Sequence, residues 1–325
     1  MEKKNIAGMS MKGGRKDNFF FCLLEYFPEK ERWFLNSLLQ VKEHQENEDD
    51  VIRKWVKDFS LKKLVLDFPL TLPPCYGCEL SCPGLSRCPI ESVRDTREKM
   101  ASLLLSDQEM KSKNPKRYEV ARNKVESIDP SKNILKIKTD EHILSRAFKR
   151  RLKKGILPYW NRPLDFWVWT QYYDQQLEIF NTSYDSFGTA SLMILSRFNY
   201  LKRHFPSELQ LFEGNIQLAL LELLKADILT NREVKGLSDF KEGMDYRLKV
   251  IKKIEQKLNI FIYESDLEVL LHFPRAFHSF ILAITGQRIQ MNQVIHPPKW
   301  ALAEESQFVI PLFFSKETSP KKTQR

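Results

Sequence analysis

The stretch from Leu64 to Pro89 limits the possible folds most, because it joins a short apolar run to a cysteine-rich loop. The apolar run, residues 64–66, is followed directly by Asp67, and three prolines lie within the next seven residues. Proline lacks the backbone N–H that a continued strand or helix needs. The pattern therefore predicts a buried strand that ends at Asp67 and presents one carboxylate at its carboxyl end.

Four cysteines fall within fourteen positions after this strand: Cys75, Cys78, Cys82 and Cys88. Their spacing, C-x2-C-x3-C-x5-C, allows one loop to surround a single metal ion or cluster with thiolates. We expect zinc, which four thiolates hold in a closed tetrahedral structural site, or an iron–sulfur cluster, which dense spacing with Cys-Pro pairs also suits. A redox pair or unliganded thiols are the alternatives.

Charge and hydropathy bear on compartment and partners. No apolar run approaches the ~20 residues that cross a bilayer, and the charged first residues lack a signal-peptide core. We therefore expect a cytoplasmic protein without membrane contact, whose thiols are reduced and favour metal or redox use over disulfides. A formal net charge of +10, from 52 Lys and Arg against 42 Asp and Glu, favours a polyanion such as nucleic acid as partner, although solubility alone explains much of it.

The chain begins with a predicted meander of three strands, over residues 5–10, 18–26 and 32–41. A helix predicted over 49–59 then leads to the strand that ends at Asp67, and such a crossover usually makes its flanking strands parallel. A later strand, 209–212, delivers Glu213 in the same way, and open α/β sheets bind ligands at such strand ends. Further elements are predicted as helices over 93–105, 141–154, 188–204, 216–228, 240–258 and 265–290, the last interrupted near Pro274, and as a final strand over 308–314.

The most basic patch lies at the end of the helix predicted over 141–154. Its cations are Lys149, Arg150, Arg151, Lys153 and Lys154, joined by Arg146 one turn earlier. We expect them to contribute to nucleic-acid binding, and a merely solvated face is the alternative. The aromatic residues that follow are Tyr159, Trp160, Phe166, Trp167, Trp169, Tyr172 and Tyr173. Rings beside cations can stack on bases, but filling a core is the commoner role of such residues.

Taken together, these elements resemble a ribonuclease H-like (RNase H-like) fold, specifically the family of uncharacterised proteins predicted to be RNase H-like nucleases. The opening IAGMSMKGG resembles the family's first strand, LVLDFPLTLP its Asp-x-Pro strand, and LQLFEGNIQLALLELL its strand-Glu-helix passage. FPRAFHSFILAITG looks like its C-terminal helix, and EESQFVIPLFF like its closing segment. The likeness leaves out the cysteine loop and much of residues 91–180.

The resemblance implies an α/β fold with an RNase H-like mixed sheet, in which a three-strand antiparallel meander is followed by parallel strands, with helices on both faces and a large helical insertion. On this basis residues 1–90 form the first part of the core and carry the cysteine loop at 75–88. Residues 91–183 form a mostly helical, basic and aromatic insertion, 184–314 the second part of the core, and 315–325 a disordered basic tail.

The family's chemistry needs carboxylates clustered at one sheet edge, where two Mg²⁺ ions about 4 Å apart activate water and stabilise the leaving oxygen. Asp67 and Glu213 match acidic positions of the family, but Ser10 replaces the first-strand acid and His278 replaces the acid of the C-terminal helix. Hydroxyl and imidazole are poor substitutes for hard anionic ligands. We therefore expect Asp67, Glu213 and His278 to form a degenerate catalytic site.

Two less favoured alternatives to a degenerate site are metal sites. One is a single Mg²⁺ or Mn²⁺ ion at Asp67 and Glu213, and the other is a two-carboxylate, one-histidine site with His278, suited to Mn²⁺, Fe²⁺ or Zn²⁺. If the protein is active, the resemblance implies a metal-dependent nuclease.

Two functions follow. The first is a divergent nuclease-family protein that binds nucleic acid, with reduced or lost phosphodiester hydrolysis. The second is a non-enzymatic interaction protein, stabilised by zinc or an iron–sulfur cluster, that uses the fold as a scaffold. The charge favours the first, and the missing acids favour the second.

Overall fold

The computed structural model describes residues 4–11, 19–41, 48–126, 138–141, 143–187, 191–302 and 307–313. The chain divides into two compact units. We call residues 1–67, 201–296 and 309–325 the sheet unit, and residues 68–200 and 297–308 the helical unit. The first division falls directly after Asp67, so the cysteine loop belongs to the helical unit.

The sheet begins with the expected antiparallel meander of β1 (Lys4–Ser10), β2 (Phe19–Phe27) and β3 (Arg32–Val41). After α1 (Glu48–Asp58), β4 (Lys63–Leu66) pairs parallel to β1, and β5 (Gln210–Glu213) pairs parallel to β4. A two-residue strand, β6 (Ile260–Phe261), adds parallel to β3. The strand order is β5-β4-β1-β2-β3-β6, so the predicted mixed α/β sheet, antiparallel and then parallel, is confirmed.

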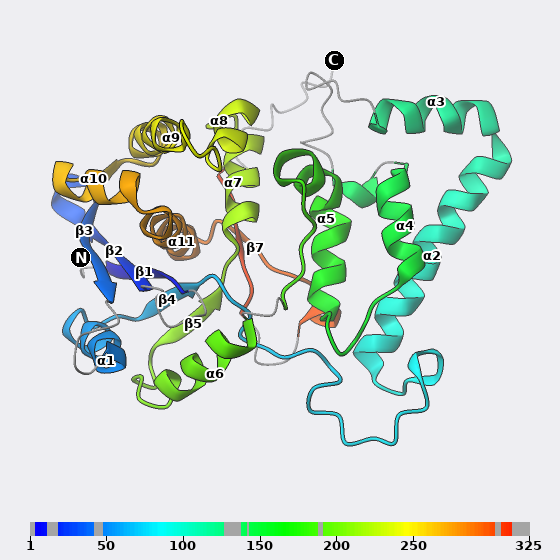
Figure 1. Ribbon diagram of the computed structural model, residues 1–325, viewed down its shortest axis with the longest axis horizontal. Coiled ribbons are helices and arrows are strands. Elements are labelled where there is room, and N and C mark those ends of the chain that lie inside the picture. Colours follow the sequence, from blue (N-terminus) through cyan, green and yellow to red (C-terminus); the bar gives the residue numbers. More distant parts are fainter. Residues whose placement is uncertain are drawn as a thin grey trace, which may run out of the picture. The chain divides into compact units, whose positions relative to one another are not determined.

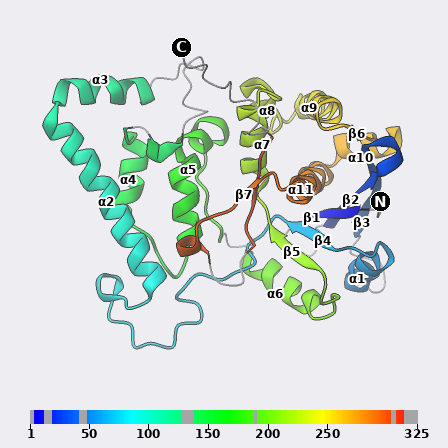
Figure 2. The same cartoon turned by 180° about the vertical axis from the view of Figure 1, so that it is seen from behind.

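Helices cover both faces of this sheet, as the apolar sequence of β2 predicts for a buried strand. Gly8 of β1 lies so close to α11 (Pro274–Gln290) that an added Cβ would be 2.3 Å from Ala283 N. Phe21 of β2 pairs with the residue of β1 that follows Gly8. Because successive side chains of a strand point to opposite faces, Phe21 lies on the face of the sheet away from α11. Its ring packs against Trp55 and Phe59, so α1 and its C-terminal turn cover the opposite face (Figures 1 and 2).

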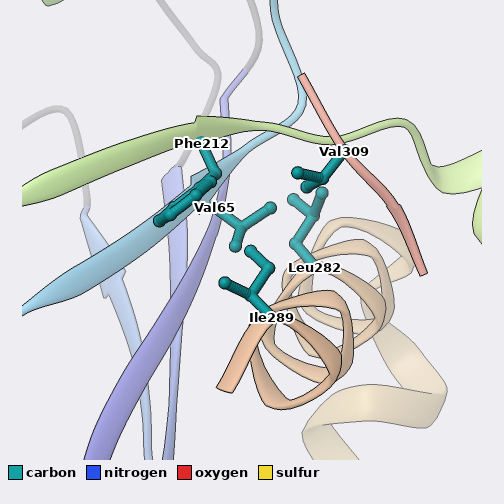
Figure 3. Packing of buried hydrophobic residues seen from close by; sticks show 5 residues of the cluster. All are labelled: Val65, Phe212, Leu282, Ile289 and Val309. Carbon is teal, nitrogen blue, oxygen red and sulfur yellow. The ribbon is translucent and has the colours of Figure 1, made fainter. Parts of the chain in front are cut away.

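The core beneath α11 joins segments that are far apart in the sequence. Figure 3 shows its residues, Val65, Phe212, Leu282, Ile289 and Val309, which come from β4, β5, α11 and the segment before β8 (Ile310–Pro311). The N–H of Val309 donates to the carbonyl of Glu213 over 3.0 Å. The predicted final strand over 308–314 is thus realised as β8, which pairs with β7 (Val294–Ile295).

The remaining helices of the sheet unit are α7 (Ile216–Lys225), α8 (Asn231–Gly236), α9 (Gly243–Leu258) and α10 (Glu264–His272). The predicted interruption near Pro274 is confirmed, because α10 ends at His272 and α11 begins at Pro274. Within the described residues no single helix has the length and apolar character to span a membrane, whereas the bent pair α10 and α11 meets that test together.

The helical unit contains α2 (Glu91–Lys113), α3 (Pro115–Glu126), α4 (Arg146–Lys154) and α5 (Pro163–Phe180), and α6 (Ser191–Lys202) crosses the boundary between the units. Helix α2 is longer than predicted. Helix α4 begins later than predicted, because Ser145 caps it by accepting the N–H of Phe148 over 3.0 Å. The predicted disordered tail, 315–325, lies outside the described residues.

Candidate functional site

Asp67 lies where the sequence predicts, directly after β4, with a buried carboxylate. Because β1 and β4 are parallel neighbours in register Met9 with Leu66, their carboxyl ends lie side by side. Ser10 Oγ donates to Asp67 Oδ2 over 2.5 Å, and the Met11 N–H donates to Oδ1 over 3.0 Å. The serine that replaces the expected acid therefore serves as a donor to the remaining one.

A third donor comes from the first turn of α11. Arg275 Nη1 lies 3.5 Å from Asp67 Oδ2 and 3.3 Å from both Ser10 Oγ and the Met11 carbonyl. The carboxylate thus has a guanidinium partner from its own chain. Burial raises the pKa of Asp67, although Ser10, Met11 and Arg275 each act to lower it. Sequence reasoning missed Arg275, yet a cation in the first turn of a helix, where the helix dipole disfavours it, is a signal that it has another partner.

His278 lies one turn farther along α11, and its buried Nδ1 has no hydrogen-bond partner among the residues that the structure describes. Its pKa is lowered from 6.5 to about 4, mainly by burial and then by the positive charges of Arg275 and Arg247. The imidazole is therefore neutral at pH 7. Arg247, on α9, donates through Nε to the Leu271 carbonyl over 2.8 Å.

Glu213 ends β5 as predicted, but the pairing register assigns its side chain to the other face from Asp67. Val65 and Phe212 are paired neighbours that both pack toward α11 (Figure 3), so the next pair, Leu66 and Glu213, points the opposite way. Asp67 belongs to the α11 face through its contact with Arg275. The two carboxylates that the resemblance groups together thus belong to opposite faces.

This edge does not fit a pair of Mg²⁺ ions, which need several oxygen ligands around each ion. Both oxygens of Asp67 are engaged by donors of the chain itself. Across the described residues, no three side chains of His, Cys, Asp or Glu are grouped so that they could hold a metal, and this applies to Asp67, Glu213 and His278.

The four cysteines lie in the loop between β4 and α2 as free thiols, with Cys82 the most exposed. The loop is tied down where the N–H of Cys75 donates to the Pro158 carbonyl over 2.9 Å. The pKa of the Cys75 thiol is raised mainly by burial and then by the proximity of Cys88, Cys78 and Cys82. The donor chemistry fits zinc or an iron–sulfur cluster, but the described positions do not gather the thiols into a ligand group, so the cysteine site stays a prediction.

The basic patch on α4 divides into two sets. Lys149 forms a short ion pair with buried Asp107, and Arg151 pairs with Asp185 over 3.0 Å. Both cations are therefore used within the helical unit. Three others, Arg150, Lys153 and Lys154, are exposed.

The aromatic passage divides in a similar way. Five rings are buried in or around α5, as the core interpretation predicts: Phe166, Trp167, Trp169, Tyr172 and Tyr173. Tyr159 and Trp160, in the turn before α5, are exposed. Comparison of this chain with protein-family models, with curated proteins and with solved structures found no match.

Proposed function

We propose that this chain is a divergent RNase H-like protein of the predicted-nuclease family, which binds nucleic acid and has reduced or lost metal-dependent phosphodiester hydrolysis. The sheet supports the ancestry, because the meander β1–β3 followed by parallel β4 and β5 is the arrangement that the resemblance implies. The close packing of α11 on β1 at Gly8 supports the match to the family's C-terminal helix.

The surroundings of Asp67 carry the proposal that hydrolysis is lost. A two-metal mechanism needs carboxylates to hold both ions. Here Arg275 provides the positive charge that compensates Asp67, and Ser10 and Met11 occupy its remaining acceptor positions. A metal ion would have to displace a charged partner and two hydrogen bonds before it reached the carboxylate.

Nucleic-acid binding is supported by the same change of charge. Replacing acids by Ser10 and His278 and adding Arg275 makes this edge less negative. Guanidinium groups pair well with phosphate, since their donors match its oxygens in a fork geometry. The net charge of +10 and the exposed cations of α4 act in the same direction.

The proposal includes a metal site in the cysteine loop, where Cys75, Cys78, Cys82 and Cys88 hold zinc or an iron–sulfur cluster. Its role is structural, because a closed set of four thiolates leaves no position open for substrate. The alternative function, a non-enzymatic interaction protein, is favoured by exposed apolar side chains in this same loop, including Leu72, Leu80 and Leu85.

The test is equilibrium binding of end-labelled single-stranded and duplex DNA and RNA, followed by fluorescence anisotropy. We expect binding at about 50 mM salt that weakens at least tenfold at about 200 mM, because phosphate contacts release counterions. The same samples, held in Mg²⁺ and then in Mn²⁺, should contain intact strands. Failure of all four nucleic acids to bind at low salt would overturn the proposal in favour of the interaction protein.

A further inference from the structure

Three exposed aromatic rings lie on two segments of the helical unit that touch each other. The exposed fractions are 64% for Tyr76, 65% for Tyr159 and 37% for Trp160. Tyr76 follows Cys75, and Tyr159 follows Pro158, the residues joined by the 2.9 Å backbone hydrogen bond. Tyr76 and Tyr159 therefore stand next to the bonded pair, one from each segment.

The turn that presents Tyr159 and Trp160 is held by its own hydrogen bonds. The N–H groups of Trp160 and Asn161 donate to the Leu157 carbonyl over 2.8 and 2.6 Å. In return Asn161 Oδ1 accepts the N–H of Leu157 over 3.2 Å, and its amide donates to Asp185 over 3.0 Å. Asn161 is buried, so the turn is anchored to the unit while the two rings beside it stay exposed.

The exposed cations of α4 lead directly into this turn. Arg150, Lys153 and Lys154 are spaced i, i+3 and i+4, which places them on one side of the helix. Phe148 and Leu152 are buried and fix the other side. Gly155, at φ +78°, then ends the helix, and Tyr159 follows Lys154 by five residues, a reach of at most ~18 Å.

The two remaining cations of the patch hold α4 in place. Arg151 lies over the Trp169 ring, 3.9 Å from its centroid, and forms an ion pair with Asp185. Asp185 also accepts the hydrogen bond from the side-chain amide of Asn161. Lys149 pairs with Asp107 on α2. The helix and the aromatic turn are thus both fixed to the same residue, Asp185, which holds the segments that carry the cations and the rings in place relative to each other.

We propose that Tyr76, Tyr159 and Trp160, together with Arg150, Lys153 and Lys154, bind single-stranded nucleic acid, with the rings stacking on bases and the cations contacting phosphates. This inference rests on the proposed nucleic-acid binding and names its substrate class. A single strand fits because its bases expose the faces that aromatic rings stack on, whereas a duplex keeps those faces covered. Stacking does not distinguish bases, so little sequence preference is expected.

A protein partner would also cover exposed rings, and Leu157 and Leu80 add apolar surface to these segments. The row of three exposed cations beside the rings favours the polyanion, because the centres of protein interfaces are depleted in charged residues and lysine in particular. Positive charge combined with exposed aromatic rings is what single-strand sites use.

The test is binding of an unstructured single-stranded oligonucleotide and its duplex to the full chain. Tyr159→Ala and Trp160→Ala should each weaken single-strand binding roughly 5- to 150-fold and leave the duplex unchanged. Tyr159→Phe, which keeps the ring, should bind like the natural protein. Phe240→Ala, which removes a fully exposed ring from the sheet unit, is the matched control and should have no effect. Changing both Lys153→Gln and Lys154→Gln should flatten the salt dependence of binding.

The outcomes separate this inference from the function on which it rests. If no single strand or duplex binds at low salt, the proposed function fails and this inference fails with it. If nucleic acid binds with the expected salt dependence but the ring variants match Phe240→Ala, or duplex is bound as tightly as single strand, the single-strand site alone is wrong. Binding that requires the rings but is indifferent to the lysines and to salt would show that the cations of α4 do not contact phosphates, and it would also overturn the site proposed here.

Discussion

The neighbours of Asp67 determine which role its carboxylate can have. In the chemistry implied by the resemblance, its charge would be compensated by a metal ion. Here Ser10, Met11 and Arg275 supply the donors and the charge from the chain itself. The residue that the resemblance marks as catalytic is therefore also a buried structural acid, and removing its partners should cost stability.

Ser10→Ala should lower the free energy of unfolding by about 1.5–3 kcal/mol, because it deletes a hydrogen bond to a buried charged group. The measurement is urea unfolding at pH 7. Ser279→Ala is the control, since the buried Ser279 hydroxyl donates to the neutral Ala276 carbonyl within α11. A loss for Ser10→Ala no greater than for the control would show that Asp67 does not depend on this donor.

Two buried groups should give opposite pH dependence between about pH 4 and pH 6. Burial raises the pKa of Asp165 from 3.8 to about 6, so ionising it costs the native state more than the unfolded state. Its contribution to stability falls as the pH rises through that range. The pKa of His278 is lowered from 6.5 to about 4, so its contribution falls as the pH drops through 6.5 toward 4.

Asp165→Asn should therefore remove a loss of stability on raising the pH, and His278→Gln should remove a loss on lowering it. Unfolding curves of both variants and of the natural protein at several pH values between about 4 and 7 test this. Because Asp165 lies in the helical unit and His278 in the sheet unit, each effect belongs to its own unit. Equal slopes in all three proteins would contradict both assignments.

At the scale of elements, the packing of β1 on α11 sets the distance between Ser10 and Arg275. Gly8 permits it, because any side chain there would meet the backbone of α11 at Ala283 and Ser279. The same contact occurs from the other side, where an added Cβ at Gly286 would lie 2.1 Å from Ile6. Two glycines that face each other's element thus bring helix and strand together beside the candidate site.

Gly8→Ala should destabilise the protein by about 1–3 kcal/mol or more, since the added carbon meets backbone atoms that cannot turn away. Gly77→Ala is the matched control, because no atom of the described residues lies within 4 Å of its added Cβ. Thermal or urea unfolding of the two variants gives the comparison. If both behave alike, the close approach of β1 and α11 is wrong.

Local signals predicted the elements that they govern. The meander, the strand that ends at Asp67 and the break at Pro274 all follow from apolar runs and from proline chemistry. Helix α5 was missed as a helix because nearly all its sides are buried, which leaves no amphipathic stripe. The strands β6 and β7 have only two residues each, too few to form a pattern.

The candidate site was predictable only in part, for a related reason. Asp67 and Glu213 could be located because each ends a strand. The ion pair with Arg275 joins positions 208 residues apart, and the assignment of Glu213 to the opposite face depends on the register of β4 with β5. Neither pairing across such a distance nor register is encoded in a short window of sequence.

At the scale of the whole molecule, the helical unit carries features that lie outside the resemblance: the cysteine loop, the exposed rings and the cations of α4. The sheet unit carries the altered acidic edge. The proposed function combines the two, with binding contributed by both units and hydrolysis lost at one.

Protein purified anaerobically without chelator should contain about one zinc ion per chain, or iron with a brown colour, because four reduced thiolates bind either tightly. Elemental analysis decides this. Changing Cys75→Ser and Cys78→Ser together should abolish the metal, whereas Cys22→Ala, at a buried position in β2, should retain it. Only trace zinc and iron in the natural protein would contradict the site.

The most direct test of the account is a cleavage assay on end-labelled single-stranded and duplex DNA and RNA in Mg²⁺ and then Mn²⁺, analysed on denaturing gels. The natural protein is compared with a variant that combines Ser10→Asp, Arg275→Gln and His278→Asp, which restores acids and frees Asp67. Circular dichroism checks that each protein is folded. We predict that the natural protein binds these strands and leaves them intact. Cleavage by the natural protein at a rate comparable to the restored variant, and lost in Asp67→Asn, would contradict it.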